Sequence, residues 1–393
     1  MDALRWRRIL GWLAGLRRPR SDQAHHRAIW WASLGFLGVT VVAACLLWTL
    51  GDVWWPVTAF LFGPRWVLAL PLAALVPAAA LLDRALLLPL AFAALLLAGP
   101  VIELRTGWRA FAVSPDPDRD LRVVTYNVAG GSGLASTAAG MAQRWNADVL
   151  LFQECGGSVR EEVRELAGPA GEGRGGGTGG GRPGVEPWLG AGLAGWSGDV
   201  RAQLCALSRF PILEVDEMDR SALEAAGGSG QVATYRLDVE GTEVRVTNVH
   251  LETPRGGFEL LRAGRVFASV DLIREKSFLR RIELQQARRW AEEGVERPRI
   301  VAGDFNTPVE SRAYRAAWSG WTNVYNRVGR GYGGTRLNGW IRPRIDHVLV
   351  DQRWAAVRAR LGEDLGSDHL PVIATIRLSD SGRSSAEPTG EDR

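Results

Sequence analysis

The sequence is poor in cysteine and histidine, which excludes several kinds of site. Its 393 residues include three cysteines, Cys45, Cys155 and Cys205, and five histidines. No CxxC pair and no HExxH motif occurs, so nothing predicts a structural or catalytic zinc site. Cys155 and Cys205 could pair in an oxidising compartment, but we expect two buried free thiols as the simpler state.

The sequence also lacks an excess of basic residues over most of its length. The formal net charge is +4, yet residues 114–378 hold 34 Lys+Arg and 34 Asp+Glu and are neutral. The excess lies in the first 27 residues, where seven arginines stand with two aspartates. Because long nucleic acids are usually held by many basic contacts, the overall charge does not by itself indicate nucleic-acid binding.

Charged residues are scarce in three long apolar stretches near the N-terminus. Ala28–Leu50 has none, and about 20 residues are enough to cross the hydrocarbon core of a membrane. A second stretch ends at Leu82, and a third runs from Ala85 to Ile102. We therefore predict a basic arm over 1–27, about three transmembrane helices over 28–103 and a linker over 104–120.

The arginines of the basic arm favour a cytoplasmic N-terminus in the plasma membrane. Three crossings would then place everything after Glu103 outside the cytoplasm. Arg105 and Arg109 follow the third stretch and favour the opposite orientation, and a count of two or four helices would also reverse the side.

The rest of the chain alternates short apolar runs with helical patterns, which predicts a β core flanked by helices. We expect one domain over 121–378, with helices up to Trp145 and over Glu259–Glu293. Gly168–Pro187 is rich in glycine and predicts a flexible loop, and 379–393 a disordered tail. The predicted strands are Leu121–Val128, Val149–Gln153, Leu204–Leu207, Val232–Val239, Val244–His250, Arg299–Ala302, Ile345–Val350 and Val372–Leu378.

Five short motifs place polar residues where an apolar strand ends, and strand ends hold functional loops in position. Each residue alone has an ordinary explanation, such as an Asx-turn or a helix cap. Together, carboxylates and amides without thiolates predict a Mg²⁺ site, with Mn²⁺ as a substitute, acting on a phosphoryl group. The motifs are TYNV (Asn127), LLFQE (Glu154), TNVHLE (His250), VAGDFNTP (Asp304, Asn306) and GSDHLPV (Asp368, His369).

In this order, TYNV, QE, HLE, GDFN, RID and SDH resemble the endonuclease/exonuclease/phosphatase superfamily over roughly Leu121–Leu378. The resemblance implies a four-layer α/β sandwich with two internal β-sheets, and metal-dependent hydrolysis of phosphodiester or phosphomonoester bonds. It implies Glu154 as the principal metal ligand, with Asn127 nearby and Asp368 as a further ligand.

The resemblance also implies catalytic roles. Asp304 would orient or deprotonate the attacking water, and Asn306 would hold a phosphate oxygen. His369 would contact the scissile phosphate, and Asp346 in RIDH would orient His369. His250 would be a second phosphate-facing histidine.

Two further residues, outside the five motifs, are assigned a role. Arg209, in LSRFPI, fits a family position for substrate binding. His347 follows Asp346 and points to the opposite face of a strand, so we expect it to be structural.

Residues 311–345 contain seven arginines and no acidic residue, with aromatic residues between them. We call this stretch the arginine segment. Arginines and aromatics together bind phosphates and stacked bases, so Arg336, Arg342 and Arg344 are predicted to bind substrate. A solvated loop with buried tryptophans is an equal alternative.

Three functions remain open at this point. One is a nuclease-like phosphodiesterase acting on nucleic acid outside the cytoplasm. Another is a phosphoesterase acting on lipid head groups, such as sphingomyelin, or on inositol phosphates. The last is an inactive membrane-tethered binding module, against which the full set of motifs argues.

Overall fold

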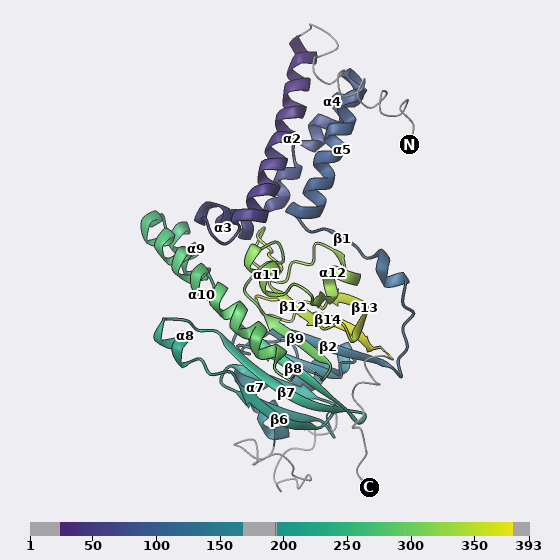
Figure 1. Cartoon of the computed structure of the whole chain (residues 1–393), viewed down its shortest axis with the longest axis vertical. Helices are drawn as coiled ribbons and strands as arrows, with labels where there is room; N and C mark the ends of the chain where they lie inside the picture. Colours follow the sequence, from purple (N-terminus) through teal and green to yellow (C-terminus); the bar gives the residue numbers. More distant parts are fainter. Residues whose placement is uncertain (1–23, 168–192, 194, 295, 380–393) are drawn as a thin grey trace.

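A computed structural model of the chain describes residues 24–167, 193, 195–294 and 296–379. Figure 1 shows a narrow helical unit standing on one end of a larger α/β domain. The glycine-rich loop predicted over 168–187, the predicted tail from residue 380 and the basic arm up to residue 23 lie outside the described residues.

The helical unit is formed by the apolar stretches of the sequence. Three of its helical segments, Ala24–Leu50, Arg65–Leu82 and Arg84–Val101, are long and apolar enough to cross a membrane. They pack on one another through Leu47, Ala79 and Leu90, which are buried. Its elements are α2 Ala24–Leu50, α3 Trp55–Phe62, η1 Arg65–Ala69, α4 Leu72–Leu82, η2 Arg84–Leu86, α5 Leu87–Leu96 and the π-helical η3 Leu97–Val101.

The α/β domain contains two six-stranded sheets. The first has the order β10-β12-β9-β8-β7-β6, and the second the order β13-β14-β2-β3-β5-β4. Only the pairs β2–β3 and β8–β9 are parallel in these two sheets. The strands are β2 Asp120–Asn127, β3 Val149–Gln153, β4 Ser197–Arg201, β5 Leu204–Ser208, β6 Ile212–Glu217, β7 Gln231–Val239, β8 Thr242–His250, β9 Arg299–Asp304, β10 Thr322–Asn323, β12 Asp346–Val350, β13 Trp354–Leu361 and β14 Val372–Leu378.

Helices cover the outer faces of both sheets, which makes the predicted four-layer sandwich. One buried cluster joins the second sheet to α6 and α7, and another joins the first sheet to α10 and α11. All helices of the α/β domain, including those that do not cover a sheet, are α6 Ala138–Trp145, α7 Gly157–Ala167, α8 Ser221–Ala225, α9 Arg255–Arg262, α10 Val266–Glu292, α11 Arg312–Ala317, α12 Val324–Val328 and the 3-10 helix η4 Trp108–Phe111, among the described residues.

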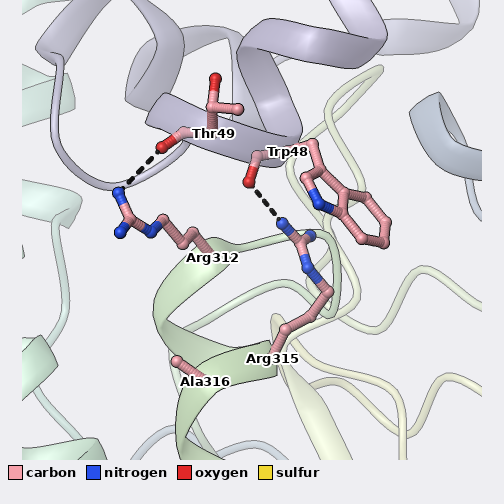
Figure 2. A pocket seen from close by; sticks show the side chains of 5 residues that line it. All are labelled: Trp48, Thr49, Arg312, Arg315 and Ala316. Atoms are coloured by element: carbon pink, nitrogen blue, oxygen red, sulfur yellow. Dashed lines mark hydrogen bonds between the residues drawn. The ribbon is translucent and has the colours of Figure 1, made fainter.

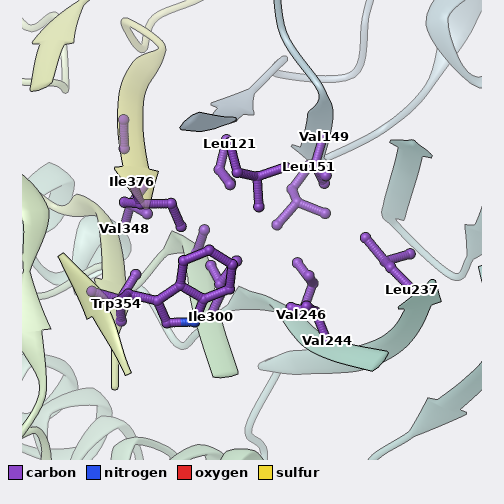
Figure 3. Close-up of a cluster of buried hydrophobic side chains, with 14 of the residues drawn as sticks. Leu121, Val149, Leu151, Leu237, Val244, Val246, Ile300, Val348, Trp354 and Ile376 are labelled. Carbon is purple, nitrogen blue, oxygen red and sulfur yellow. The ribbon is translucent and has the colours of Figure 1, made fainter. Parts of the chain in front are cut away.

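The main core lies between the two sheets (Figure 3). In β9, Ile300 and Ala302 point into this core, while Val301 between them packs on the helical side. Successive side chains of a strand point to opposite faces, and here both faces are buried. Burying one such side chain fully contributes roughly 1.5–3 kcal/mol. This is why the strands appear in the sequence as continuous apolar runs.

The structure differs from the predicted elements in several places. The single helix expected over Glu259–Glu293 is two helices, because Gly264 adopts φ +74° and ends α9 at a left-handed residue. Strands β4, β6 and β13 were not predicted. The linker is partly ordered, since β1 (Arg105–Thr106) pairs with β11 (Arg330–Gly331).

Cys155 and Cys205 form a disulfide, so the expectation of free thiols is wrong. Their Cα atoms lie 5.9 Å apart. Antiparallel pairing of β3 with β5 places Cys205 opposite Phe152, and the Cys155 N–H then donates to the Gln203 carbonyl. Strand pairing across 50 residues brings the two cysteines together, and the sequence spacing alone does not reveal it.

Candidate active site

The polar residues of the motifs meet where strands of the two sheets end. Asp304 ends β9 and lies in register with His250 of β8 on one side and Asp346 of β12 on the other. In the facing sheet, Asn127 ends β2 and Glu154 directly follows β3. The Asn127 side-chain amide joins the two sheets, because Nδ2 donates to Asp304 Oδ2 at 3.1 Å.

A buried acid–histidine–acid cluster forms the centre of the site. His369 Nδ1 lies 2.8 Å from Asp346 Oδ2, and His369 Nε2 lies 3.7 Å from Asp304 Oδ2. All three side chains are about 1% exposed, and their ligand atoms lie within 4.8 Å of one another. The imidazole ring therefore stands between two carboxylates.

Burial and the neighbouring charges shift the pKa values of Asp304 and His369. Burial, together with the Asp346 carboxylate, raises the pKa of Asp304 to about 6. Burial lowers the pKa of His369, but Asp346 and Asp304 outweigh this effect and raise it to about 9. Near neutral pH, His369 is thus an imidazolium, while Asp304 is poised to exchange a proton.

Glu154 lies beside this cluster with its carboxylate partly exposed. Its Oε1 accepts from Asn127 Nδ2 at 3.0 Å and lies 3.7 Å from His250 Nε2. The amide oxygen of Asn127 instead accepts from the Ala129 N–H at 3.0 Å. Asn127 therefore turns its nitrogen toward the two carboxylates and holds them in position.

Asp368 and two arginines form the opposite side of the site. Asp368 Oδ2 lies 2.6 Å from Arg336 Nη2 and 3.8 Å from Arg255 Nη1. Asp368 Oδ1 is buried without a hydrogen-bond partner among the described residues. Arg336 Nη1 also lies 2.7 Å from His369 Nε2, so a guanidinium and an imidazole face one another at the centre of the site.

The turn after β9 is held by tight contacts. Gly303 is required there, because a Cβ atom would lie 1.9 Å from the Val249 carbonyl oxygen. The Asn306 N–H donates to Asp304 Oδ1 at 2.8 Å, and its side-chain amide donates to the Leu251 carbonyl at 2.8 Å. Asn306 thus fixes Asp304 and the loop after β8.

Two of the predicted substrate-binding arginines lie away from these residues. Arg209 pairs with Asp148 at 3.0 Å, before the start of β3, whereas Glu154 follows its end. At about 3.3 Å per residue, the six steps of extended chain from Asp148 to Glu154 span roughly 20 Å. Arg344 is 2% exposed and lies over the Tyr325 ring at 5.0 Å. The structure thus places Arg209 and Arg344 apart from the residues gathered at the strand ends, and their contacts with substrate stay predictions.

Three further residues singled out in the sequence lie in different surroundings. Arg336 contacts the site, whereas Arg342 is exposed on the same loop. His347 points away from Asp346, as predicted, and its Nε2 lies 2.9 Å from the Thr307 carbonyl oxygen. Burial lowers the pKa of His347 to about 3, so this ring is neutral and structural.

Several residues that support the site were not identified from the sequence. Gln153 Nε2 donates to Asn248 Oδ1 at 2.7 Å, which links the two sheets directly beneath the site. The Ser367 hydroxyl donates to the Asn127 carbonyl and accepts from the His369 N–H. Gln153 and Asn248 could have been identified, because they are polar residues within buried strands. No pattern in the sequence pointed to Arg255, because it begins α9 outside every motif.

Glu283 of α10 holds the loop that follows β8. Its carboxylate accepts from the backbone N–H groups of Gly230 and Glu252 at 3.0 and 2.5 Å. Burial is the main cause that raises the pKa of Glu283 to about 7, with the charge of Glu252 adding to it. The loop beside the active site thus depends on a carboxyl group that titrates near neutral pH.

We predict that the free energy of unfolding falls as the pH rises from about 4.5 to about 7. In this range the folded state binds more protons at Glu283 than the unfolded state, and the loss amounts to at most about 3 kcal/mol. Thermal unfolding in detergent at pH 5 and 8 is the measurement, with Glu283→Gln as the variant that cannot ionise. An equal pH dependence of wild type and Glu283→Gln would contradict this assignment.

The chain is similar to known proteins at the level of a family model and of solved structures. The family model described as the Endonuclease/Exonuclease/phosphatase family matches residues 124–369. No curated protein matches the sequence. Among solved structures, D. rerio TDP2 in complex with a single-strand DNA product is 15% identical, with a TM-score of 0.46, and the match covers 66% of this chain and 99% of that one. An endonuclease/exonuclease/phosphatase from Beutenbergia cavernae is 18% identical, with a TM-score of 0.42 and coverages of 66% and 72%.

Proposed function

Because the chain belongs to the endonuclease/exonuclease/phosphatase family, we propose that it is a membrane-anchored, divalent-metal-dependent hydrolase of phosphodiester bonds. The observation that carries this proposal is the buried Asp304–His369–Asp346 cluster beside Glu154 at the strand ends. Carboxylates that suit a metal ion and cationic groups that suit a phosphate converge there within about 4 Å of one another.

The residues fit a hard divalent cation such as Mg²⁺, or Mn²⁺ in its place. Glu154 offers a partly exposed carboxylate, and Asp368 Oδ1 is a buried oxygen without a hydrogen-bond partner among the described residues. Oxygen ligands of this kind, without thiolates, are those that Mg²⁺ prefers. When bound, the ion would supply positive charge that stabilises the phosphoryl oxygens.

The chain's own residues would carry out the proton transfer and hold the phosphate. Asp304 would accept a proton from water as the water oxygen bonds to phosphorus. The ester P–O bond then breaks, and the leaving oxygen takes up a proton in return. His369 would donate from Nε2 to a phosphate oxygen, while Asp346 holds its other nitrogen.

The contact between Arg336 and His369 supports a phosphate at this point. In the imidazolium form, both ring nitrogens of His369 carry hydrogen, so Nε2 and the Arg336 guanidinium face each other as two donors at 2.7 Å. Two cationic donors repel one another, and an anionic oxygen that accepts from both removes the repulsion.

The catalytic domain is proposed to lie outside the cytoplasm. The arginine-rich arm before three apolar helices favours this orientation. The Cys155–Cys205 disulfide supports it independently, because disulfides persist in oxidising compartments.

The proposal is tested with the full-length protein in detergent and the soluble diester bis(p-nitrophenyl) phosphate. We expect hydrolysis in Mg²⁺ or Mn²⁺, loss of activity in excess EDTA, and recovery when Mg²⁺ is restored. Undiminished hydrolysis in EDTA, or no hydrolysis with any divalent ion, would rule the proposal out.

Arg336 is proposed to bind the phosphate, and Arg209 serves as a matched control far from the site. Arg336→Ala should raise KM about tenfold with a smaller change in kcat, because it removes a charge-assisted hydrogen bond made in both ground and transition states. Steady-state kinetics on the same diester measure this. Arg209→Ala should leave both constants unchanged, and an equal effect of the two variants would remove Arg336 from the site.

A further inference from the structure

The arginine segment lies against the end of the apolar helical unit. Figure 2 shows a pocket between α2 and α11, where Arg312 Nη1 donates to the Thr49 carbonyl at 3.2 Å and Arg315 Nη2 to the Trp48 carbonyl at 2.8 Å. The start of the arginine segment therefore faces the C-terminal end of α2, where a membrane-spanning helix would leave the bilayer.

Buried charges make this attachment specific. Asp52 follows α2 and accepts from the Ser311 hydroxyl and from the Ala313 N–H in the first turn of α11. Arg65, at the start of the second apolar segment, pairs with Glu310 at 2.8 Å. Because these groups are buried, a change of orientation would leave unpaired charges. The catalytic domain is thus held in one position relative to the helices.

Both loops that border the active site touch the helical unit. The loop that carries Arg336 continues to Trp340, whose carbonyl accepts from the Trp66 indole at 3.3 Å. Because the four residues from Arg336 to Trp340 span at most about 14 Å, this contact with the helical unit lies close to the active site. On the other side, α9 begins with Arg255, and one turn later Phe258 packs on Phe62 at 5.3 Å between ring centroids.

The same edge of the domain carries exposed apolar side chains beside arginines. Phe267 is 89% exposed at the start of α10, next to the exposed Val266 and Arg265. Figure 1 shows this tip of α9 and α10 level with α3, where the helical unit meets the domain. Trp340 is 79% exposed. Aromatic and basic side chains together are typical of surfaces that lie in a membrane interface.

The charge of this edge is suited to lipid head groups. The arginine segment has no acidic residue among its seven arginines, although residues 114–378 are neutral as a whole. Its Arg312 and Arg315 side chains lie against the end of α2, where this helix would leave the bilayer. Basic residues close to a membrane surface are attracted by anionic lipids.

We infer that the site acts on a phosphodiester in the head group of a membrane lipid, whose apolar part stays in the bilayer. This inference rests on the proposed function. Water bonds to the lipid phosphorus, the P–O ester bond breaks, and the released alcohol takes up a proton. The fixed attachment of the domain holds the catalytic residues close to the membrane surface, where such head groups lie.

The test uses full-length protein reconstituted in vesicles of equimolar phosphatidylcholine and phosphatidylglycerol in Mg²⁺. Lipid products are compared with cleavage of an added single-stranded DNA oligonucleotide and of bis(p-nitrophenyl) phosphate. We expect lipid hydrolysis with kcat/KM at least about tenfold above that for DNA. DNA cleavage without lipid hydrolysis would overturn the inference and leave the proposed function standing, whereas loss of all three activities would contradict the proposed function itself.

A pair of surface variants separates membrane contact from folding. Phe267→Asp should lower lipid hydrolysis at least about fivefold, since it places a charge in the membrane interface, and should leave hydrolysis of the soluble diester unchanged. Leu213→Asp replaces an exposed apolar residue of β6, at the opposite end of the domain, and should change neither. Equal lipid hydrolysis by wild type and both variants would contradict contact of this edge with the membrane.

Discussion

Replacement of Asp304 by asparagine is expected to lower kcat for the soluble diester by at least about 10²-fold. Asparagine keeps the shape of the side chain but cannot accept the proton of the attacking water, and general-base catalysis typically contributes about 10²- to 10⁴-fold. The variant should remain folded. Burial already raises the pKa of Asp304, so a neutral side chain is tolerated there.

The matched control for this prediction is Asp271→Asn, on the exposed face of α10. It removes the same charge from the solvent-exposed surface and should leave kcat unchanged. If Asp304→Asn retains wild-type kcat while its thermal unfolding is normal, Asp304 is not the base and another group must activate the water.

His369 and Asp346 are expected to act as one unit. His369→Ala should lower kcat by at least about 10²-fold, because it removes the donor that would stabilise the phosphoryl oxygens. Asp346 is the partner of His369 Nδ1 at 2.8 Å and, as an anion, has no attraction for phosphate. It would act by orienting the imidazole and keeping it cationic.

A double-mutant comparison measures this coupling. Asp346→Ala should cost much of the activity in the wild-type background and little in the His369→Ala background, because losses within one unit are not additive. If Asp346→Ala costs the same factor in both backgrounds, the pairing carries no catalytic role and Asp346 acts elsewhere.

The sheets could be predicted largely because their strands are buried on both faces. Val149–Gln153 and Val372–Leu378 are apolar runs next to polar motifs, and the structure has these strands at the predicted bounds. β6 (ILEVDE) was missed because it is an edge strand with exposed residues. Short runs with mixed polarity do not separate strand from loop.

Only those parts of the site that lie at the ends of strands could be predicted from the sequence. Asp304, His250 and Asp346 come together because neighbouring strands place them in register. The roles of Arg209 and Arg344 were assigned from motif position and composition, which do not tell an exposed side chain from one that is buried or at the wrong end of a strand. The position of the arginine segment against the helices depends on packing between distant parts of the chain.

Direct measurement of metal binding tests most closely whether the carboxylates at the strand ends form a divalent-metal centre. Mn²⁺ binding to the full-length protein can be followed by electron paramagnetic resonance for wild type, Glu154→Gln and the control Glu161→Gln, an exposed residue of α7. We predict that wild type and Glu161→Gln bind Mn²⁺ alike and that Glu154→Gln binds it at least about tenfold more weakly. Equal binding by all three proteins would contradict the account.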